Sequence, residues 1–215
     1  MTAPITVHHL GVSQSERVVW VCEELAVDYR LVNYARDPVT RMAPPEYKAL
    51  HPMGTAPVLT DGETTFGESG AIVEYIVAKY GKGRLAVAAD AANFADYLFW
   101  LHFANGSLVT TEMMAMVTAM AGAPDNPMSA IINDRAERAY DLIEKRLGEV
   151  PYFAGDALTA ADIMMVFTLT TMRAFSPRDH SSRPNILAYL QRIAARPAYQ
   201  RAMAKGDPGM EPLLT

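Results

Sequence analysis

Cysteine is nearly absent from this chain, since Cys22 is the only one in 215 residues. An intramolecular disulfide and a cysteine-rich metal site are therefore excluded. Cys22 lies on the apolar face of a predicted helix and outside any Cys-x-x-Cys pattern, which indicates a buried structural thiol. The five histidines show no metal-ligand spacing, so we expect no metal.

Long basic runs and long apolar runs are also lacking. The 19 Lys and Arg against 24 Asp and Glu give a net charge of −5, which argues against nucleic acid as a partner. No apolar stretch approaches the roughly 20 residues that span a bilayer, so we expect no membrane partner. The N-terminal sequence MTAPITVHHL contains no basic region followed by an apolar core and predicts no secretion signal. We therefore expect a cytoplasmic protein.

The first third of the chain alternates strands and helices. Ile5-Thr6-Val7 predicts a strand, and the pattern Ser13-x-x-Glu16 predicts a capping box with the helix beginning near Ser13 or Ser15. Residues 28–32 alternate polar and apolar side chains and predict a second strand. A strand–helix–strand order implies a right-handed crossover and a parallel pair.

The next pattern, residues 51–75, combines a hairpin with a helix start. Asp61-Gly62 lies between two β-rich runs and predicts the turn, and Pro57 precedes the first run. Ser69 is placed to cap the helix that follows. Because a helix N-terminus attracts a carboxylate and Glu68 can hold an ammonium group, this pair fits an α-amino acid.

From Asp90 onward the sequence predicts only helices. Residues 94–108 begin a long one, the segment Ala123-Pro124-Asp125-Asn126-Pro127 breaks it, and residues 132–147 form the next. Thr159 and Asp162 predict a capping box, with Leu158 and Ile163 as its hydrophobic staple. Two short helices follow, divided at Pro197.

Ala56-Pro57-Val58-Leu59 followed by Glu68-Ser69-Gly70-Ala71-Ile72 resembles the glutathione-binding half of the glutathione S-transferase superfamily. The segment 97–108 resembles the bacterial and fungal branch. The resemblance implies an α+β fold, with a thioredoxin-like βαβ-ββα domain over residues 1–80 and an all-α helical bundle over residues 90–215. It also implies glutathione as co-substrate, an apolar electrophile as second substrate, and a homodimer.

The resemblance also assigns the glutathione contacts. In the family, the residue before a cis-proline offers its main chain to the cysteinyl part, and a Glu-Ser pair binds the γ-glutamyl end. The expected binding residues are Thr55, Ala56, Pro57, Glu68, Ser69 and Arg17. Many relatives carry Lys, Gln or His just before the cis-proline region to bind the glycine carboxylate. Gly54 and Thr55 stand there in this chain, so that anchor is weaker or comes from elsewhere.

Ser13 is the expected catalytic residue, because the family places the thiol-activating hydroxyl just after the first strand. A thiol with a pKa near about 8.5 is mostly protonated at neutral pH, whereas the thiolate is the nucleophile. Ser13 could instead serve only to cap the helix, and this role is compatible with thiol activation. Ser15, backbone groups or Arg17 are the alternative activators. Arg17 fits a surface partner for Glu16 or Glu24 equally well.

The second substrate is expected on the first long helix of the second domain. Phe103, Ser107, Thr111 and Met114 recur at the spacing of one helical stripe. The same stripe could be domain core or a subunit contact. The clustered methionines fit either flexible core filler or an adaptable apolar pocket. Besides conjugation, two functions stay open: glutathione-dependent reduction of a peroxide or disulfide, and a non-catalytic binding module.

Overall fold

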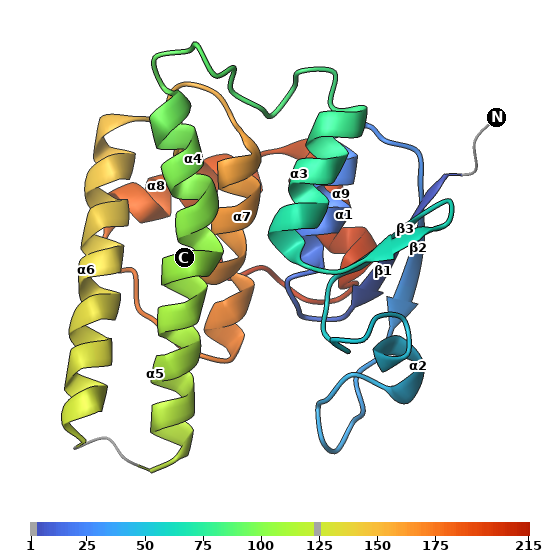
Figure 1. Cartoon of the computed structure of the whole chain (residues 1–215). Coiled ribbons are helices and arrows are strands. Elements are labelled where there is room, and N and C mark those ends of the chain that lie inside the picture. The colour runs from blue at the N-terminus through green and yellow to red at the C-terminus, as the bar shows by residue number, and fades with distance from the viewer. Residues whose placement is uncertain (1–3, 123–125) are drawn as a thin grey trace. The chain divides into compact units, whose positions relative to one another are not determined.

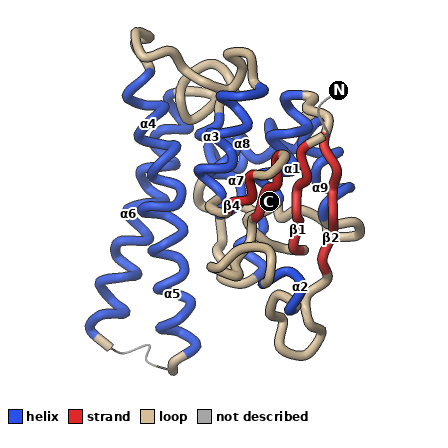
Figure 2. The backbone as a smooth tube through the Cα atoms, turned by 45° about the vertical axis from the view of Figure 1, so that its right-hand side comes forward, coloured by secondary structure: helices blue, strands red, loops and turns tan. Residues whose placement is uncertain are grey.

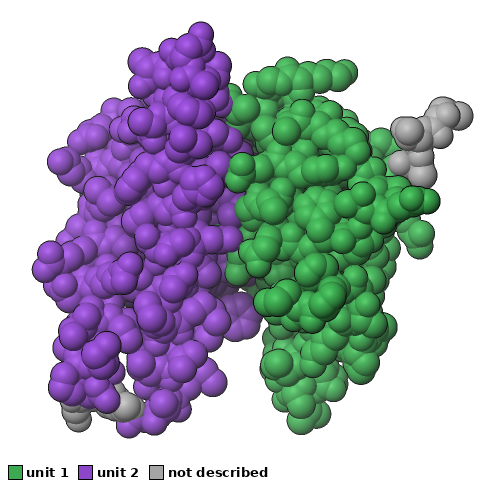
Figure 3. Space-filling view, viewed as in Figure 1, with its two compact units in different colours: residues 1–86, 194–212 green, residues 87–193, 213–215 purple. Residues whose placement is uncertain are grey.

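The computed structural model describes residues 4–122 and 126–215. The predicted helix break at Ala123-Pro124-Asp125 lies outside the described residues. The chain forms two compact units (Figure 3). Unit 1 contains the described residues up to Ala86 together with Ala194–Pro212, and unit 2 contains Val87–Ile193 and Leu213–Thr215. The domain limits 1–80 and 90–215 stay a prediction, and compactness groups residues 194–212 with unit 1.

Unit 1 is built on a four-stranded mixed sheet in the order β2-β1-β3-β4 (Figures 1 and 2). β1 pairs with β2 in parallel, as the strand–helix–strand order predicts, while β3 runs antiparallel to both β1 and β4. The strands are β1 (Ile5–Leu10), β2 (Tyr29–Tyr34), β3 (Val58–Asp61) and β4 (Thr64–Phe66). The helices of unit 1 are α1 (Glu16–Leu25), α2 (Pro45–Lys48), α3 (Ser69–Tyr80) and α9 (Pro197–Gly206).

The two faces of β1 carry different partners. Ile5, Val7 and His9 are fully or almost fully buried, while Thr6 and His8 are only half-buried. On the second face, Leu10 packs with Tyr47 of α2 and with Val58. Because side chains alternate along a strand, His9 shares the face of Ile5 and Val7.

Helix α9 packs against α1 although 172 residues separate their paired groups. The rings of Trp20 and Tyr199 meet edge to face, with centroids 5.0 Å apart. The Glu24 carboxylate accepts from the Arg196 guanidinium at 2.7 and 2.9 Å. These contacts fix the start of α9 on α1, and its last residue, Gly206, faces the His9 ring of β1.

Local turns differ from the sequence prediction in one detail. Asp61 is paired with Thr64 as the last residue of β3, so Gly62-Glu63, rather than Asp61-Gly62, forms the hairpin loop. Gly62 has a φ of 60°, which glycine adopts at little cost.

Unit 2 is all-helical. Its helices are α4 (Phe94–Phe103), a π-helical segment (Ala104–Val109), α5 (Thr110–Met120), α6 (Pro127–Glu149), α7 (Ala160–Leu169), a 3₁₀ segment (Thr171–Ala174) and α8 (Pro184–Ala194). Every residue of α7 is buried, so α7 is the central helix, as its apolar spacing predicts. Among the described residues, no helix is both long and apolar enough to cross a membrane.

The capping box predicted at the start of α7 is present. The Asp162 carboxylate accepts from the Thr159 N–H at 2.8 Å, and the Thr159 side chain accepts from the Asp162 N–H. Leu158 and Ile163, the predicted staple, are both buried. Asp162 also accepts from the Phe153 N–H at 3.0 Å and the Tyr189 hydroxyl at 3.1 Å.

Candidate functional site

The candidate site begins in the loop between β1 and α1. The Ser13 hydroxyl lies 2.7 Å from both the Leu10 carbonyl oxygen and Ser15 Oγ. Ser15 is fully buried, accepts from the Leu10 N–H at 3.1 Å and lies 2.9 Å from His9 Nδ1. Ser13 is 8% exposed and therefore stands at the outer end of a buried line of polar groups.

The predicted capping box of α1 is not formed. Ser15 occupies the N-cap position but makes no side-chain cap, and Ser13 Oγ accepts from the Ser15 N–H instead of the Glu16 N–H. Both hydroxyls are drawn toward β1 because Leu10 and His9 offer buried polar partners there. The two hydroxyls therefore bond to β1 and do not cap α1.

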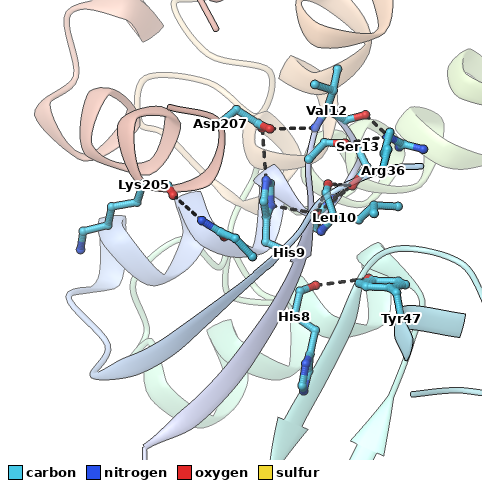
Figure 4. A network of polar contacts seen from close by, with 12 residues as sticks. His8, His9, Leu10, Val12, Ser13, Arg36, Tyr47, Lys205 and Asp207 are labelled. Atoms are coloured by element: carbon cyan, nitrogen blue, oxygen red, sulfur yellow. Dashed lines mark hydrogen bonds and ion pairs between the residues drawn. The ribbon is translucent and has the colours of Figure 1, made fainter. Parts of the chain in front are cut away.

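The loop itself is held in an uncommon conformation. Val12 has a φ of 52°, which is costly for a β-branched residue by about 1–3 kcal/mol. Its N–H donates to Asp207 Oδ1 at 2.8 Å, and Arg36 donates to the carbonyls of Gly11 at 2.8 Å and Val12 at 3.1 Å (Figure 4). Asp207, which directly follows α9, and Arg36, which follows β2, thus hold the loop that carries Ser13.

Arg17 is fully buried, which contradicts its reading as a surface partner of Glu16 or Glu24. It donates to Gln14 Oε1 at 2.5 Å and to Ser69 Oγ at 3.0 Å. Burial lowers the pKa of Arg17 to about 9, partly offset by the Glu16 carboxylate, so it stays cationic at neutral pH. Ser69 in turn donates to Gln14 Oε1 at 3.2 Å. The loop after β1 and the start of α3 therefore share one polar cluster.

Ser69 does not cap α3 as expected. It is the first residue of the helix, and Glu68 takes the N-cap position without a side-chain cap. Glu68 is exposed and has a φ of 69°, a left-handed conformation that is uncommon outside glycine. The side chain of Glu68 is thereby presented to solvent at a helix N-terminus.

The segment before β3 carries the remaining predicted glutathione residues. The Ala56–Pro57 bond is cis, as the family resemblance implies. Pro57 is buried, Ala56 is half-buried and Thr55 is exposed. His51 accepts from the Met53 N–H at 3.3 Å, as an ordinary loop histidine does.

The predicted second-substrate stripe does not lie on a regular α-helix. The π-helical segment Ala104–Val109 interrupts it, and Thr110 Oγ1 donates to the Asn105 carbonyl at 2.7 Å. Phe103, Ser107 and Met114 are half-buried, whereas Thr111 is buried. Met114 lines an open groove of about 420 Å³ on unit 2, but the other three residues do not. The groove is lined by Val109, Thr110, Met113, Met114, Val117, Thr118 and Ile132.

Three polar residues of this region were not predicted from the sequence: His9, Gln14 and Asp207. The alternation Ile5, Val7, His9 could have indicated that His9 points into the core. No sequence signal connects Asp207 to it, because 198 positions separate the two. Cys22, in contrast, is buried as predicted, and burial raises the pKa of its thiol. Within the described ranges, 4–122 and 126–215, no three His, Cys, Asp or Glu side chains gather as a metal site.

The fold and site define a thioredoxin-like unit followed in the chain by a helical bundle, and comparison with known proteins identifies that class. Residues 8–84 match the model for the glutathione S-transferase N-terminal domain, and residues 108–197 match the C-terminal domain model. Glutathione S-transferase 3 of Schizosaccharomyces pombe is 32% identical, covering 94% of this chain and 87% of its own length. Glutathione S-transferase 3 of Zea mays is 30% identical, covering 94% of both chains.

A solved structure agrees with these relatives. The crystal structure of a glutathione S-transferase from Actinobacillus pleuropneumoniae has a TM-score of 0.88 and 32% identity, over 96% of this chain and 94% of that one. The chain belongs to the glutathione S-transferase family, and it is an enzyme of the transferase class. The predicted family and α+β fold are confirmed.

Proposed function

We propose that this enzyme binds glutathione on unit 1 and transfers its thiolate to an apolar electrophile. This proposal rests mainly on the polar cluster that joins the loop after β1 to the start of α3. Gln14, the neighbour of Ser13, accepts from both Arg17 and Ser69. One small ligand could therefore contact the Ser13 loop and the N-terminus of α3 together.

The γ-glutamyl end of glutathione is assigned to the start of α3. The first turn of a helix presents N–H groups that have no partner within the helix, and these attract a carboxylate. Arg17, buried and 3.0 Å from Ser69 Oγ, adds positive charge there. The exposed Glu68 carboxylate suits the ammonium group, and Thr55, Ala56 and Pro57 are proposed for the cysteinyl part.

The thiol is assigned to Ser13. Its hydroxyl is the most exposed group of the Ser13–Ser15 pair, so it is the one that a ligand can reach. A hydroxyl that donates to the sulfur favours the thiolate over the thiol. The electrophile is assigned to the stripe formed by Phe103, Ser107, Thr111 and Met114. If Phe103→Ala leaves the KM for the electrophile unchanged, this assignment is wrong.

Loss of either group at the start of α3 should weaken glutathione capture. Glu68→Ala and Ser69→Ala are each expected to raise the glutathione dissociation constant by about tenfold, because a charge-assisted contact contributes roughly 1.5–3 kcal/mol. Calorimetric titration of glutathione measures this. Glu74→Ala is the matched control, since Glu74 is an exposed carboxylate further along α3.

The outcomes separate the assignment from the function. If the wild type binds and conjugates glutathione while both variants match the Glu74→Ala control, glutathione binds elsewhere. If the wild type neither binds glutathione nor conjugates any of a panel of small electrophiles, the proposed function is wrong.

We also propose a homodimer, formed through the apolar face of α5 and α6. Several apolar side chains of these helices are about half exposed or more, which is unusual for a monomer surface: Met113, Val117, Met120, Met128 and Ile131. Wild-type protein should have the mass of two chains in light scattering, and Val117→Glu should shift it to one. Val39→Glu, an exposed valine of unit 1, should stay dimeric. A monomeric wild type contradicts the proposal.

A detoxifying role in the cytoplasm completes the proposal. It is supported by the apolar electrophile proposed above and by the near absence of cysteine, which suits a reducing compartment. Cell fractionation tests the location.

A further inference from the structure

Four side chains form a continuous polar line from Ser13 into the core of unit 1. Ser13 Oγ lies 2.7 Å from Ser15 Oγ, and Ser15 Oγ lies 2.9 Å from His9 Nδ1. His9 Nε2 lies 3.2 Å from Asp207 Oδ2 (Figure 4). His9 and Ser15 have no exposed surface, so the line approaches solvent only at its two ends, Ser13 at 8% exposed and Asp207 at 7% exposed.

The donors in this line can be assigned from its inner end. His9 Nε2 and Asp207 Oδ2 lie 3.2 Å apart without the alignment of a hydrogen bond, and the charge of the carboxylate favours the His9 tautomer with its proton on Nε2. In the neutral imidazole Nδ1 then has a lone pair, and the Ser15 hydroxyl donates to it. Ser15 Oγ is left to accept from the Leu10 N–H and from Ser13, whose single proton can go either to Ser15 Oγ or to the Leu10 carbonyl oxygen, both 2.7 Å away. Every hydroxyl in the line can thus pass its proton inward.

We propose, resting on the function above, that His9 receives the proton of the glutathione thiol through Ser13 and Ser15, and that Asp207 positions His9 for this. The S–H proton moves to Ser13 Oγ, the Ser13 proton to Ser15 Oγ, and the Ser15 proton to His9 Nδ1. Only these O–H, N–H and S–H bonds form and break, and nothing is oxidised or reduced.

The proton shift leaves each group where catalysis needs it. The Ser15 hydroxyl now donates to Ser13, and the Ser13 hydroxyl donates to the thiolate. The imidazolium of His9 lies between the carboxylate of Asp207 and the newly charged sulfur, so no net charge is added to the site.

The surroundings of His9 hold this arrangement in place. A Cβ at Gly206 would lie 3.2 Å from the His9 ring atoms Cε1 and Nε2, so glycine permits α9 to approach the ring. The Asp207 carboxylate is itself fixed by the Val12 N–H at 2.8 Å. Arg36, which donates to the Gly11 and Val12 carbonyls, is the cation on the other side of this loop. A merely structural role, in which His9 and Asp207 only tie α9 to β1, uses the same contacts.

Proton counting distinguishes the two roles without any substitution. The probe is glutathione, titrated into wild-type enzyme near neutral pH by calorimetry in two buffers of different ionisation enthalpy, with thiolate measured by ultraviolet absorbance. The proton relay, from the thiol through Ser13 and Ser15 to His9, predicts that bound glutathione becomes thiolate with almost no proton released to the buffer, because His9 retains the proton. A structural role predicts about one proton released per thiolate formed.

Asp207→Asn tests the positioning role. Asn retains an oxygen for the Val12 N–H but presents an amide donor to Nε2, which favours the His9 tautomer with its proton on Nδ1. That tautomer cannot accept from Ser15. The midpoint of the thiolate titration of bound glutathione should rise by about one pH unit, and the conjugation rate near pH 6.5 should fall about tenfold. The affinity for glutathione should change less than about threefold. Asp61→Asn, which removes a carboxylate elsewhere in unit 1, should change neither.

The failures are distinguishable. A wild type that binds glutathione, forms thiolate and releases about one proton for each overturns the relay but leaves the proposed function intact. An Asp207→Asn variant that titrates like Asp61→Asn overturns the positioning role of Asp207. A wild type that binds no glutathione overturns the proposed function and the relay together.

Discussion

Asp162→Ala is expected to lower the free energy of unfolding by about 3–5 kcal/mol, because the carboxylate is the acceptor for several buried donors. The Phe153 N–H, the Thr159 N–H and the Tyr189 hydroxyl all donate to it. Each donor that loses its acceptor in the core costs about 1–3 kcal/mol. Capping alone would account for only about 0.5–2 kcal/mol.

Chemical denaturation of wild type and variant measures this loss. Asp156→Ala is the control, since Asp156 is exposed in the loop before α7 and should change stability by less than about 0.5 kcal/mol. A loss for Asp162→Ala no larger than that of the control would mean that the buried donors find other partners.

The pH dependence of this effect has a definite sign. Burial raises the pKa of Asp162 to about 6, against the opposing effect of its hydrogen bonds. The folded state then binds the Asp162 proton more tightly than the unfolded chain does. The stability that protonated Asp162 contributes is therefore fully present below the unfolded pKa of about 3.8 and is lost as pH rises through about 6. Wild type should therefore gain up to about 3 kcal/mol relative to Asp162→Asn between pH 7 and pH 4.

Asp162 also shows which part of the fold the sequence could predict. Its bond to Thr159 joins residues three apart, and such local patterns can be found in a sequence. Its bonds to Phe153 and Tyr189 depend on how helices pack, and nothing local indicates them. The same holds for α9: its spacing predicts a helix, but its contacts with α1 rest on Trp20–Tyr199 and Glu24–Arg196 pairs far apart in sequence.

The candidate site divides in the same way. Pro57, Glu68 and Ser69 could be found because they lie in one short pattern that resembles a known family. The Phe103–Met114 stripe assumed a regular helical period, and the π-helical segment changes that period. His9 and Asp207 were missed because their pairing exists only after the chain has folded. The hydroxyls of Ser13 and Ser15 form a local hydrogen-bond pattern that competes with helix capping, and their partners in it are the Leu10 backbone and the buried His9 ring.

Ser13→Ala is the prediction that bears most directly on the chemistry. Removing the hydroxyl should leave glutathione affinity within a few-fold, because we propose that the start of α3 binds the other end of the molecule. The thiolate titration of bound glutathione should move toward that of the thiol in solution, and conjugation near pH 6.5 should fall by about ten- to a hundredfold. Raising the pH should recover much of this loss, since the solution then ionises the thiol.

The controls follow from the hydrogen bonds of unit 1. Ser15→Ala is not a neutral control, because Ser15 bonds to both Ser13 and His9. Thr60→Val removes a hydroxyl from β3 that bonds to His8 and Thr65, and it should leave the thiolate titration unchanged. Ser13→Thr retains a hydroxyl and should restore most of the rate. If the titration midpoint of Ser13→Ala equals that of wild type, Ser15, Arg17 or a backbone N–H activates the thiol instead.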